Sequence, residues 1–291
     1  MVARTPGEDT MDLNEARIQA ENYGPGYGTA YGPGYGPDHV SGYGSELTRL
    51  DECFSDPASG LNHLAVSEPG PVLLLGAPGV GKGTQAEKLA ELWGVPTIST
   101  GEILRTNVAN GTPLGIQANR IMKLGGLVPD QIMNGMVADR LGFADTASGF
   151  ILDGFPRTVH QAEWLDRYLS DHREGAVLGI ISMHMDFRGI VERVVNRRVC
   201  PLCKTVYNTH LMPPVRVGRC DKDDVELIQR SDDRLEVFET RLEVFKRETE
   251  PLIEYFRGRA LFIEVDAEKP PSSVTRDIVA GLVSSRMQIA R

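Results

Sequence analysis

The residues GAPGVGKGT, numbers 76–84, give the clearest indication of how this chain folds. A short apolar run at 72–75 precedes them, and residues 82–93 repeat apolar side chains at helical spacing. In such a turn, glycines allow successive backbone N–H groups to point at phosphate oxygens, and the dipole of the following helix adds positive potential. Lys82 is placed to reach the β- and γ-phosphates of a nucleoside triphosphate. We therefore expect a phosphate-binding loop between a buried strand and a helix.

Beyond this loop the chain alternates short apolar runs with amphipathic stretches, which is the pattern of repeated βα units around a parallel sheet. We expect buried strands at 72–75, 97–99, 150–153, 177–184 and 261–265. A long amphipathic helix is expected over 233–257, with a kink at Pro251. Between 199 and 231 the alternation gives way to a segment that carries Cys, Pro and Gly, which predicts a small subdomain attached to the sheet. The expected fold class is α/β.

Composition and charge restrict the classes of function that the chain can have. Its 291 residues are 41% hydrophobic and carry a formal net charge of −9. This acidic balance argues against binding of nucleic acid or of an anionic membrane, since both need a dominant basic field. The sequence has no apolar run near the roughly 20 residues of a spanning helix, and no apolar core of a signal peptide. We expect an enzyme that works in the cytoplasm without a membrane or nucleic-acid partner.

The first 70 residues differ in composition from all that follow. Tyrosine recurs at Tyr23, Tyr27, Tyr31 and Tyr35 among glycines, prolines and small polar residues. Such a segment has too few apolar residues to bury a core, so we expect residues 1–70 to be a disordered extension. A docking tail rich in tyrosine is the alternative interpretation of this segment.

Arginines recur where a phosphate site would need them. Phosphoryl transfer depends on positioning and on positive charge around the transferred group. Arg105 closes the stretch 99–105, in which Ser99 and Glu102 have the spacing of a capping box that starts a helix. Arg157 follows an expected strand within DGFPR. The others lie next to the expected subdomain, at Arg193, Arg197, Arg230 and Arg241.

The subdomain between 199 and 231 carries a pattern of metal ligands. Cys200 and Cys203 form a Cys-x2-Cys pair, and Cys220 is followed by Asp223 at the same spacing. Zinc takes four tetrahedral ligands and accepts carboxylate oxygen beside thiolates, so these four residues predict a closed, structural zinc site. Asp224 and His210 are alternative fourth ligands.

Four segments together resemble one known family. GAPGVGKGTQA, STGEILR, DGFPRTVHQAE, and RRVCPLC through to QRSDDRLEVFETRL are similar to the adenylate kinases, in the long form whose lid carries zinc. The resemblance extends from about residue 71 to 282. It implies a P-loop nucleoside monophosphate kinase fold over 71–287, with a five-stranded parallel sheet flanked by helices, an AMP-binding subdomain at 99–128 and a lid at 197–231. The implied reaction converts MgATP and AMP into two ADP, with zinc in the lid, in a monomer.

The resemblance also implies roles for individual residues. On the ATP side it implies Gly79, Val80, Gly81, Lys82, Gly83, Thr84, Arg193, Arg197, Val206, Tyr207 and Lys269. On the AMP side it implies Thr100, Arg105, Gly126, Leu127, Val128, Gly154, Phe155, Pro156, Arg157, Gln161, Arg230 and Arg241, with Gln161 reading the adenine. The implied catalytic residues are Lys82, Asp153, Arg157, Arg197, Arg230 and Arg241, and Asp153 would orient Mg²⁺ through water.

The sequence departs from the family pattern at a few positions, and other functions stay open. Glu102 stands where the family has aspartate, and Gly126 replaces a lysine seen in some members. Gly83 is a departure of another kind, because the common phosphate-binding motif has Ser or Thr directly after the lysine, whereas here Gly83 precedes Thr84. One alternative is a kinase for UMP or CMP. A second is a zinc-ribbon protein that binds nucleic acid, and a third is a regulatory adapter that works through the N-terminal tail.

Overall fold

The computed structural model describes residues 70–173, 175–259 and 261–289. The expectations for residues 1–69 therefore lie outside the described residues. Among those that are described, no helix combines the length and the apolar character that crossing a membrane requires.

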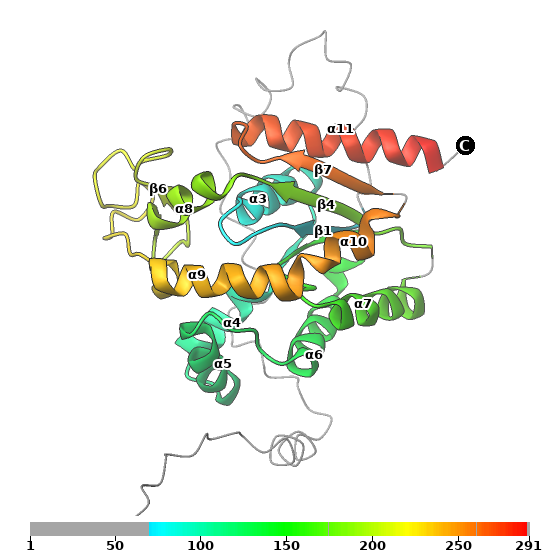
Figure 1. The fold of residues 1–291 in the computed structure, drawn as a ribbon, viewed down its shortest axis with the longest axis horizontal. Helices are drawn as coiled ribbons and strands as arrows, with labels where there is room; N and C mark the ends of the chain where they lie inside the picture. The colour runs from blue at the N-terminus through cyan, green and yellow to red at the C-terminus, as the bar shows by residue number, and fades with distance from the viewer. Residues whose placement is uncertain (1–69, 174, 260, 290–291) are drawn as a thin grey trace, which may run out of the picture.

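The described residues form one central sheet whose five strands all run parallel (Figure 1). The strands are β1 (Gly70–Leu75), β2 (Thr97–Ser99), β3 (Gly149–Asp153), β4 (Gly179–His184) and β7 (Phe262–Asp266). Their order in the sheet is β2-β3-β1-β4-β7, so each connection crosses over the sheet through at least one helix. The predicted five-stranded parallel sheet is confirmed, with β4 beginning two residues later than the sequence suggested.

Helices cover both faces of this sheet. Their bounds are α3 (Lys82–Trp93), α4 (Thr100–Ala109), α5 (Pro113–Lys123), α6 (Asp130–Leu141), α7 (Val159–His172), α8 (Phe187–Val195), α9 (Leu235–Val244), α10 (Pro251–Arg257) and α11 (Pro271–Ile289). Side chains of β1 alternate between the faces: Val72 and Leu74 pack with α3 and α11, whereas Leu73 packs with α6, α7 and α10. Both faces of β1 are buried, as expected of a central parallel strand.

The segment from 197 to 230 leaves the sheet as a separate small unit (Figure 1). It carries a two-stranded antiparallel sheet, β5 (Arg197–Val199) with β6 (Val206–Asn208). The unit has its own small buried cluster, which includes Cys200, Tyr207 and Cys220. We call residues 197–231 the lid, which is the range that the family resemblance implies. In the view of Figure 1, α4 and α5 form a second unit that lies below the sheet.

The expectation of one helix over 233–257 is wrong in two respects. A 3-10 turn (Ser231–Asp233) precedes α9, which begins only at Leu235. A π-helical turn (Phe245–Thr249) then separates α9 from α10, and the N–H of Glu250 donates to the carbonyl of Phe245. Proline lacks an N–H and its ring crowds the carbonyl four residues earlier, so the helix is interrupted by a widened turn just before Pro251, where a kink was expected.

Candidate active site

The predicted phosphate-binding loop lies between β1 and α3. Gly81 caps α3 with a φ of 110°, a conformation open to glycine at little cost. A Cβ on Gly79 would lie 2.3 Å from Val194 Cγ2, so this position also excludes a side chain. Lys82 Nζ donates to the carbonyls of Gly76 at 2.7 Å and Ala77 at 3.0 Å, and is thereby held over the loop. The loop thus presents a helix N-terminus and an ammonium group to the same space.

Electrostatics set Lys82 apart from an ordinary lysine. Its pKa is lowered to about 8, chiefly because burial disfavours the charged form. Asp153 raises the pKa in opposition, whereas Arg157 and Arg241 lower it further. A bound anion would relieve this unfavourable environment and raise the pKa again.

The predicted arginines converge on the same space from distant parts of the chain. Burial lowers the pKa of both Arg157 and Arg230 to about 10, and it also lowers that of Arg241. Mutual repulsion adds to this effect, since Arg241 acts on Arg157 and Arg105 acts on Arg230. Burying like charges together is costly unless an anion compensates them. The cluster therefore has the electrostatics of a site for several phosphates.

Two aspartates that the sequence analysis did not single out pair with these arginines. Arg241 forms an ion pair with Asp232 at 2.9 Å, and Arg197 Nε donates to Asp233 Oδ2 at 2.7 Å. Burial lowers the pKa of Arg197, but its hydrogen bond to Asp233 raises the pKa above the usual value. Asp233 is fully buried. Both aspartates lie in the segment QRSDDR, close behind Arg230, and this closeness was the signal in the sequence that could have indicated them.

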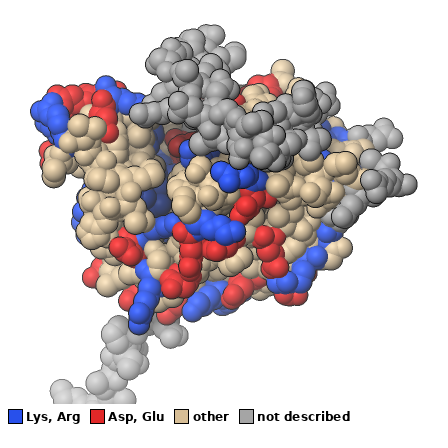
Figure 2. Space-filling view, turned by 90° about the horizontal axis from the view of Figure 1, so that it is seen from above, with Lys and Arg blue, Asp and Glu red and all other residues tan. Residues whose placement is uncertain are grey.

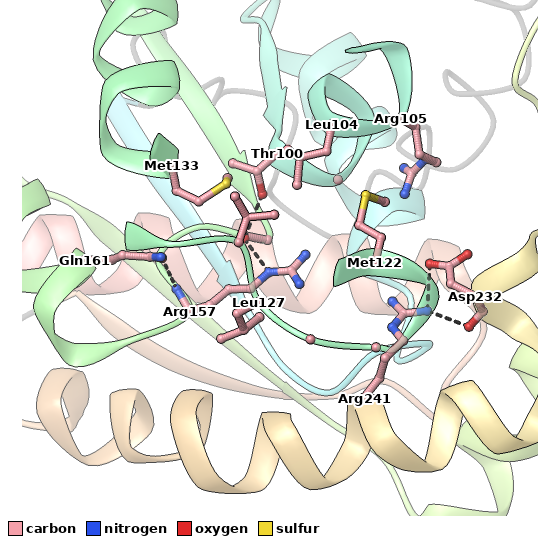
Figure 3. Close-up of a pocket in the computed structure, with 15 residues that line it drawn as sticks. Thr100, Leu104, Arg105, Met122, Leu127, Met133, Arg157, Gln161, Asp232 and Arg241 are labelled. Atoms are coloured by element: carbon pink, nitrogen blue, oxygen red, sulfur yellow. Dashed lines mark hydrogen bonds and ion pairs between the residues drawn. The ribbon is translucent and has the colours of Figure 1, made fainter. Parts of the chain in front are cut away.

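A pocket opens beside this cluster, between α4, the loop after α5 and the loop after β3 (Figure 3). Of the residues expected on the AMP side, it is lined by Thr100, Arg105, Gly126, Leu127, Val128, Gly154, Arg157, Gln161 and Arg241. Figure 3 shows Gln161 and Met133 at one end and Arg105, Asp232 and Arg241 at the other. The pocket therefore has an end with an amide and apolar walls and an end with charges.

Three residues expected on the AMP side do not line this pocket: Phe155, Pro156 and Arg230. Phe155 is 1% exposed and packs edge-on against Trp164 in the core, because an apolar ring at the end of β3 gains more from burial than from the polar pocket. Arg230 belongs to the neighbouring arginine cluster. The lining residues Leu104, Met122 and Met133 were not foreseen.

Gln161 is 2% exposed and has a hydrogen-bond partner at each end of its amide. Its oxygen accepts from the backbone N–H of Arg157 at 2.7 Å, and its nitrogen donates to Asp130 Oδ1 at 2.7 Å. Arg157 is itself held by its Nε, which donates to the carbonyl of Gly154 at 2.8 Å. The amide and the guanidinium thus have fixed positions at the pocket.

The helix expected after Ser99 is present, but its capping box is not formed. Ser99 occupies the N-cap position of α4 without a side-chain hydrogen bond to the helix. Thr100 turns its hydroxyl away from α4 and donates to the carbonyl of Gly154 at 2.8 Å. This contact ties the start of α4 to the loop after β3, but it does not cap the helix, because the Thr100 hydroxyl donates to a carbonyl instead of accepting from a helix N–H.

Asp153 ends β3 next to the phosphate-binding loop. Its Oδ2 lies 3.7 Å from the point that a Cβ on Gly83 would occupy. The carboxylate therefore faces the first turn of α3, where the phosphates of a bound nucleotide would be. A carboxylate oxygen at this point fits the preference of Mg²⁺ for hard oxygen ligands and for water held by them.

The residues expected on the far side of the ATP site occupy different environments. Arg193 bridges the loop and β7, donating to the carbonyl of Val80 at 3.0 Å and to that of Ala267 at 2.9 Å. Lys269 forms an exposed ion pair with Asp277 at 2.8 Å. Val206 is half-buried at the start of β6. Tyr207 points into the interior of the lid, where its hydroxyl accepts from the N–H of Asp221.

The expected metal ligands Cys200, Cys203, Cys220 and Asp223 lie together in the lid, with ligand atoms within 4.8 Å of one another. Cys203 Sγ is 3.6 Å from Cys220 Sγ, which is 3.6 Å from Asp223 Oδ2. Ligands about 2.3 Å from a tetrahedral zinc ion lie about 3.7 Å apart, so the cluster fits zinc. Asp224 pairs instead with Arg216 at 2.8 Å. The other alternative ligand, His210, lies outside this cluster.

Known proteins are similar to this chain over most of its length. A family model described as adenylate kinase matches residues 74–261. An adenylate kinase of Caldanaerobacter subterraneus subsp. tengcongensis is 43% identical over 215 residues, which are 74% of this chain and 97% of that protein. Adenylate kinases of Clostridium beijerinckii and Clostridium perfringens are 44% and 41% identical and cover 71% and 75% of this chain. The alignments cover 95% and 100% of those two proteins.

Proposed function

Because the chain belongs to the adenylate kinase family, we propose that the site described above divides between an ATP and an AMP. The chain is a phosphotransferase that interconverts ATP and AMP with two ADP. The observation that carries our assignment of residues is the convergence of Lys82 with buried arginines between the phosphate-binding loop and the pocket. A kinase for UMP or CMP and a zinc-ribbon nucleic-acid binder are not favoured by these relatives.

On the donor side, the loop and Lys82 would hold the phosphates of ATP. Backbone N–H groups at the N-terminus of α3 and the Lys82 ammonium supply positive potential there. Arg193 supports the same loop from α8 through Val80. The proposed ATP site thus combines a rigid loop with cations from the lid and α8.

On the acceptor side, the pocket would hold AMP with its base at Gln161 and its phosphate toward Arg105 and Arg157. The apolar walls at Leu104 and Met133 suit a purine ring, and the charged end suits a phosphate. Arg157 lies near both Lys82 and Arg241, which supports a position for it between the two nucleotides. This arrangement supports in-line transfer of the phosphoryl group.

The protein would accelerate transfer chiefly through charge and position. Negative charge on the equatorial oxygens of the moving group would be met by Arg157, Arg197, Arg230 and Arg241. In the described structure Asp232 and Asp233 pair with Arg241 and Arg197, so phosphates would compete for these arginines when both nucleotides bind. Asp153 would help to hold Mg²⁺, which would supply neutralisation of phosphate charge.

In the lid, a zinc ion held by Cys200, Cys203, Cys220 and Asp223 would have a structural role. Four protein ligands leave no open coordination position for substrate. The lid has few buried apolar residues of its own, so the metal would supply much of its folding free energy. We also assign to residues 197–231 the closing motion over ATP and to residues 99–128 that over AMP.

We further propose that neither nucleic acid nor a membrane is a partner of this chain. Support comes from the net charge of −9 and from the face seen in Figure 2, where basic and acidic side chains are interspersed. Nucleic-acid binding needs a continuous basic stripe or patch.

The test of the proposed function is a panel of acceptors. Purified protein receives MgATP with AMP, UMP, CMP or GMP in turn, and the diphosphates are separated and quantified. We expect ADP formation with AMP at a kcat/KM far above that with the other acceptors. Faster turnover with UMP or CMP would contradict the assignment of AMP to the pocket.

A further inference from the structure

Asp130 is a residue that neither the motifs nor the phosphate chemistry accounts for. It stands in the first turn of α6, and its carboxylate reaches two residues at the start of α7. Oδ1 accepts from Gln161 Nε2 at 2.7 Å and Oδ2 accepts from Thr158 Oγ1 at 2.8 Å, across 31 and 28 residues of chain. A surface aspartate that merely favours a helix N-terminus needs neither of these long-range bonds.

The neighbours of Gln161 fix which way its amide faces. A backbone N–H can only donate, so the N–H of Arg157 requires the amide oxygen on its side. A carboxylate can only accept, so Asp130 requires the amide nitrogen on the other side. A flipped amide would bring N–H against N–H and oxygen against oxygen. Because Gln161 is 2% exposed, water has little room to relieve those contacts.

The carboxylate that imposes this orientation is itself fixed. Thr158 caps α7, and its oxygen accepts from the N–H of Gln161 at 3.2 Å. Its hydroxyl proton is therefore directed at Asp130 Oδ2, which leaves Oδ1 to Gln161. The hydrogen bonds that link Thr158, Asp130 and Gln161 therefore have only one possible assignment of donors and acceptors.

The fixed amide has a defined remaining hydrogen-bonding capacity. An amide offers two N–H donors and two lone pairs, and each internal bond uses one. One donor and one acceptor remain, on the side chain that lines the pocket in Figure 3. Adenine presents an amino donor at position 6 beside an acceptor at N1, whereas hypoxanthine and guanine present an acceptor at O6 beside an N1–H donor. Pairing with a 6-oxopurine in the same pose requires the amide to flip.

We propose that Asp130 is a positioning residue that sets base specificity, by holding the Gln161 amide in the orientation that pairs with a 6-aminopurine and rejects a 6-oxopurine. This inference rests on the proposed function, which places the base of the acceptor nucleotide against Gln161. Asp130 is not among the residues that line the pocket. It acts through the amide, and Arg157 contributes the opposing constraint through its backbone, where substitution of the side chain does not remove it.

The test compares AMP with IMP, which differs from AMP only in the donor and acceptor pattern at positions 6 and 1. In Asp130→Asn, the new amide can donate to a flipped Gln161 oxygen and so weakens the constraint. We expect the ratio of kcat/KM for AMP to that for IMP to fall at least about tenfold, through KM for the monophosphate, with KM for ATP unchanged. Asp130→Ala, which removes the carboxylate altogether, should lower the ratio in the same direction.

The matched control is Asp139→Asn, which removes one carboxylate from a later turn of the same helix. It should leave the ratio at the wild-type value. Thermal unfolding of each variant accompanies the kinetics. A merely structural role of Asp130 would reduce kcat/KM for AMP and IMP by the same factor, so an unchanged ratio in both Asp130 variants would overturn the proposal.

Two further measurements separate this proposal from the proposed function. If wild-type protein does not phosphorylate AMP, the proposed function is wrong, and the inference that rests on it falls as well. If Gln161→Ala keeps the wild-type ratio, the base does not lie against Gln161, which overturns both the placement of AMP and the inference. If Gln161→Ala lowers the ratio of kcat/KM for AMP to that for IMP while the Asp130 variants keep the wild-type ratio, only the role of Asp130 is contradicted.

Discussion

Hydrogen bonds and burial together fix the position of the Arg157 guanidinium and separate it from water. Its Nε is tied to Gly154, its backbone N–H to Gln161 and its carbonyl to Thr249, so the guanidinium has little freedom to move. Burial lowers its pKa to about 10, which still leaves the group charged at neutral pH. A fixed, poorly solvated charge stabilises developing negative charge better than one that must reorganise from water.

Removing this charge should affect chemistry more than ATP binding. We expect Arg157→Ala to lower kcat by about a hundredfold or more, while the dissociation constant for ATP changes little. A coupled assay of ADP formation and calorimetry with ATP measure the two quantities. Arg188→Ala is the matched control, because Arg188 is an exposed arginine in α8. An unchanged kcat in Arg157→Ala would remove it from the catalytic residues.

Lys82 should make nucleotide binding depend on pH. Its pKa in the described structure is about 8, and nearby phosphates raise it, so near pH 8 binding of ATP takes up about half a proton. Binding should weaken as pH rises above 8, since more of the free protein then carries a neutral lysine.

Calorimetry in two buffers of different ionisation enthalpy measures this proton uptake. Lys82→Arg keeps a positive charge that does not titrate in this range, so its uptake should vanish. Equal uptake in Lys82→Arg and wild-type protein would assign the proton to another group.

At the scale of single residues, some members of the site could be predicted from the sequence alone and others could not. Lys82 and the arginines lie in short motifs whose spacing can be read directly, and the structure brings them together. Asp130 gave no signal, because its partner Gln161 is 31 residues away on another helix. Such pairs depend on how two helices pack, which the local pattern does not encode.

Elements with strong local determinants were predicted well, and those set by tertiary contacts were not. α3 has the predicted bounds because the glycine turn fixes its start and Gly94 follows its end. The helix over 233–257 is divided instead, since Pro251 requires a widened turn and Ser231–Asp233 form a turn that holds Asp233 against Arg197. The hydrophobic pattern is the same for a continuous helix and for a divided one.

The lid is the element whose stability should depend on metal. Treatment with a strong chelator and Cys203→Ser should each lower the unfolding temperature by at least about 4 °C, because metal-binding free energy is also folding free energy. Turnover well below the unfolding temperature should fall much less, since in the proposed function the phosphates would be met by Lys82 and the arginines.

Asp223→Asn should also weaken metal binding, whereas Asp224→Asn is the control because Asp224 pairs with Arg216 instead. Elemental analysis of protein purified without chelator completes the test. Absence of zinc, or an unchanged unfolding temperature in Cys203→Ser, would contradict the structural role of the metal.

At the scale of the whole molecule, the order of the strands assembles the site. The phosphate-binding loop follows β1, the Gly154–Arg157 segment follows β3, and α4 follows β2, and these three strands are neighbours in the sheet. Ligands of open parallel sheets bind where the carboxyl ends of neighbouring strands meet. The sequence predicted the parallel strands but not their order, so the proximity of these loops had to come from the structure or from the family resemblance.

The catalytic body should not need the N-terminal segment. The first described strand begins at Gly70 and the family match begins at residue 74. We expect removal of residues 1–68 to leave kcat/KM for AMP unchanged and the unfolding temperature within about 2 °C of the full chain. A tenfold loss of activity, or a fall of several degrees, would show that the segment belongs to the folded body.

The most direct test of the whole assignment uses ADP as the only nucleotide. Purified full-length protein is incubated with ADP and Mg²⁺, and ATP, ADP and AMP are quantified over time by chromatography. A site that holds one nucleotide at the phosphate-binding loop and another in the pocket should convert ADP into ATP and AMP in equal amounts until equilibrium. Persistence of ADP, or release of AMP and phosphate without ATP, would contradict the account.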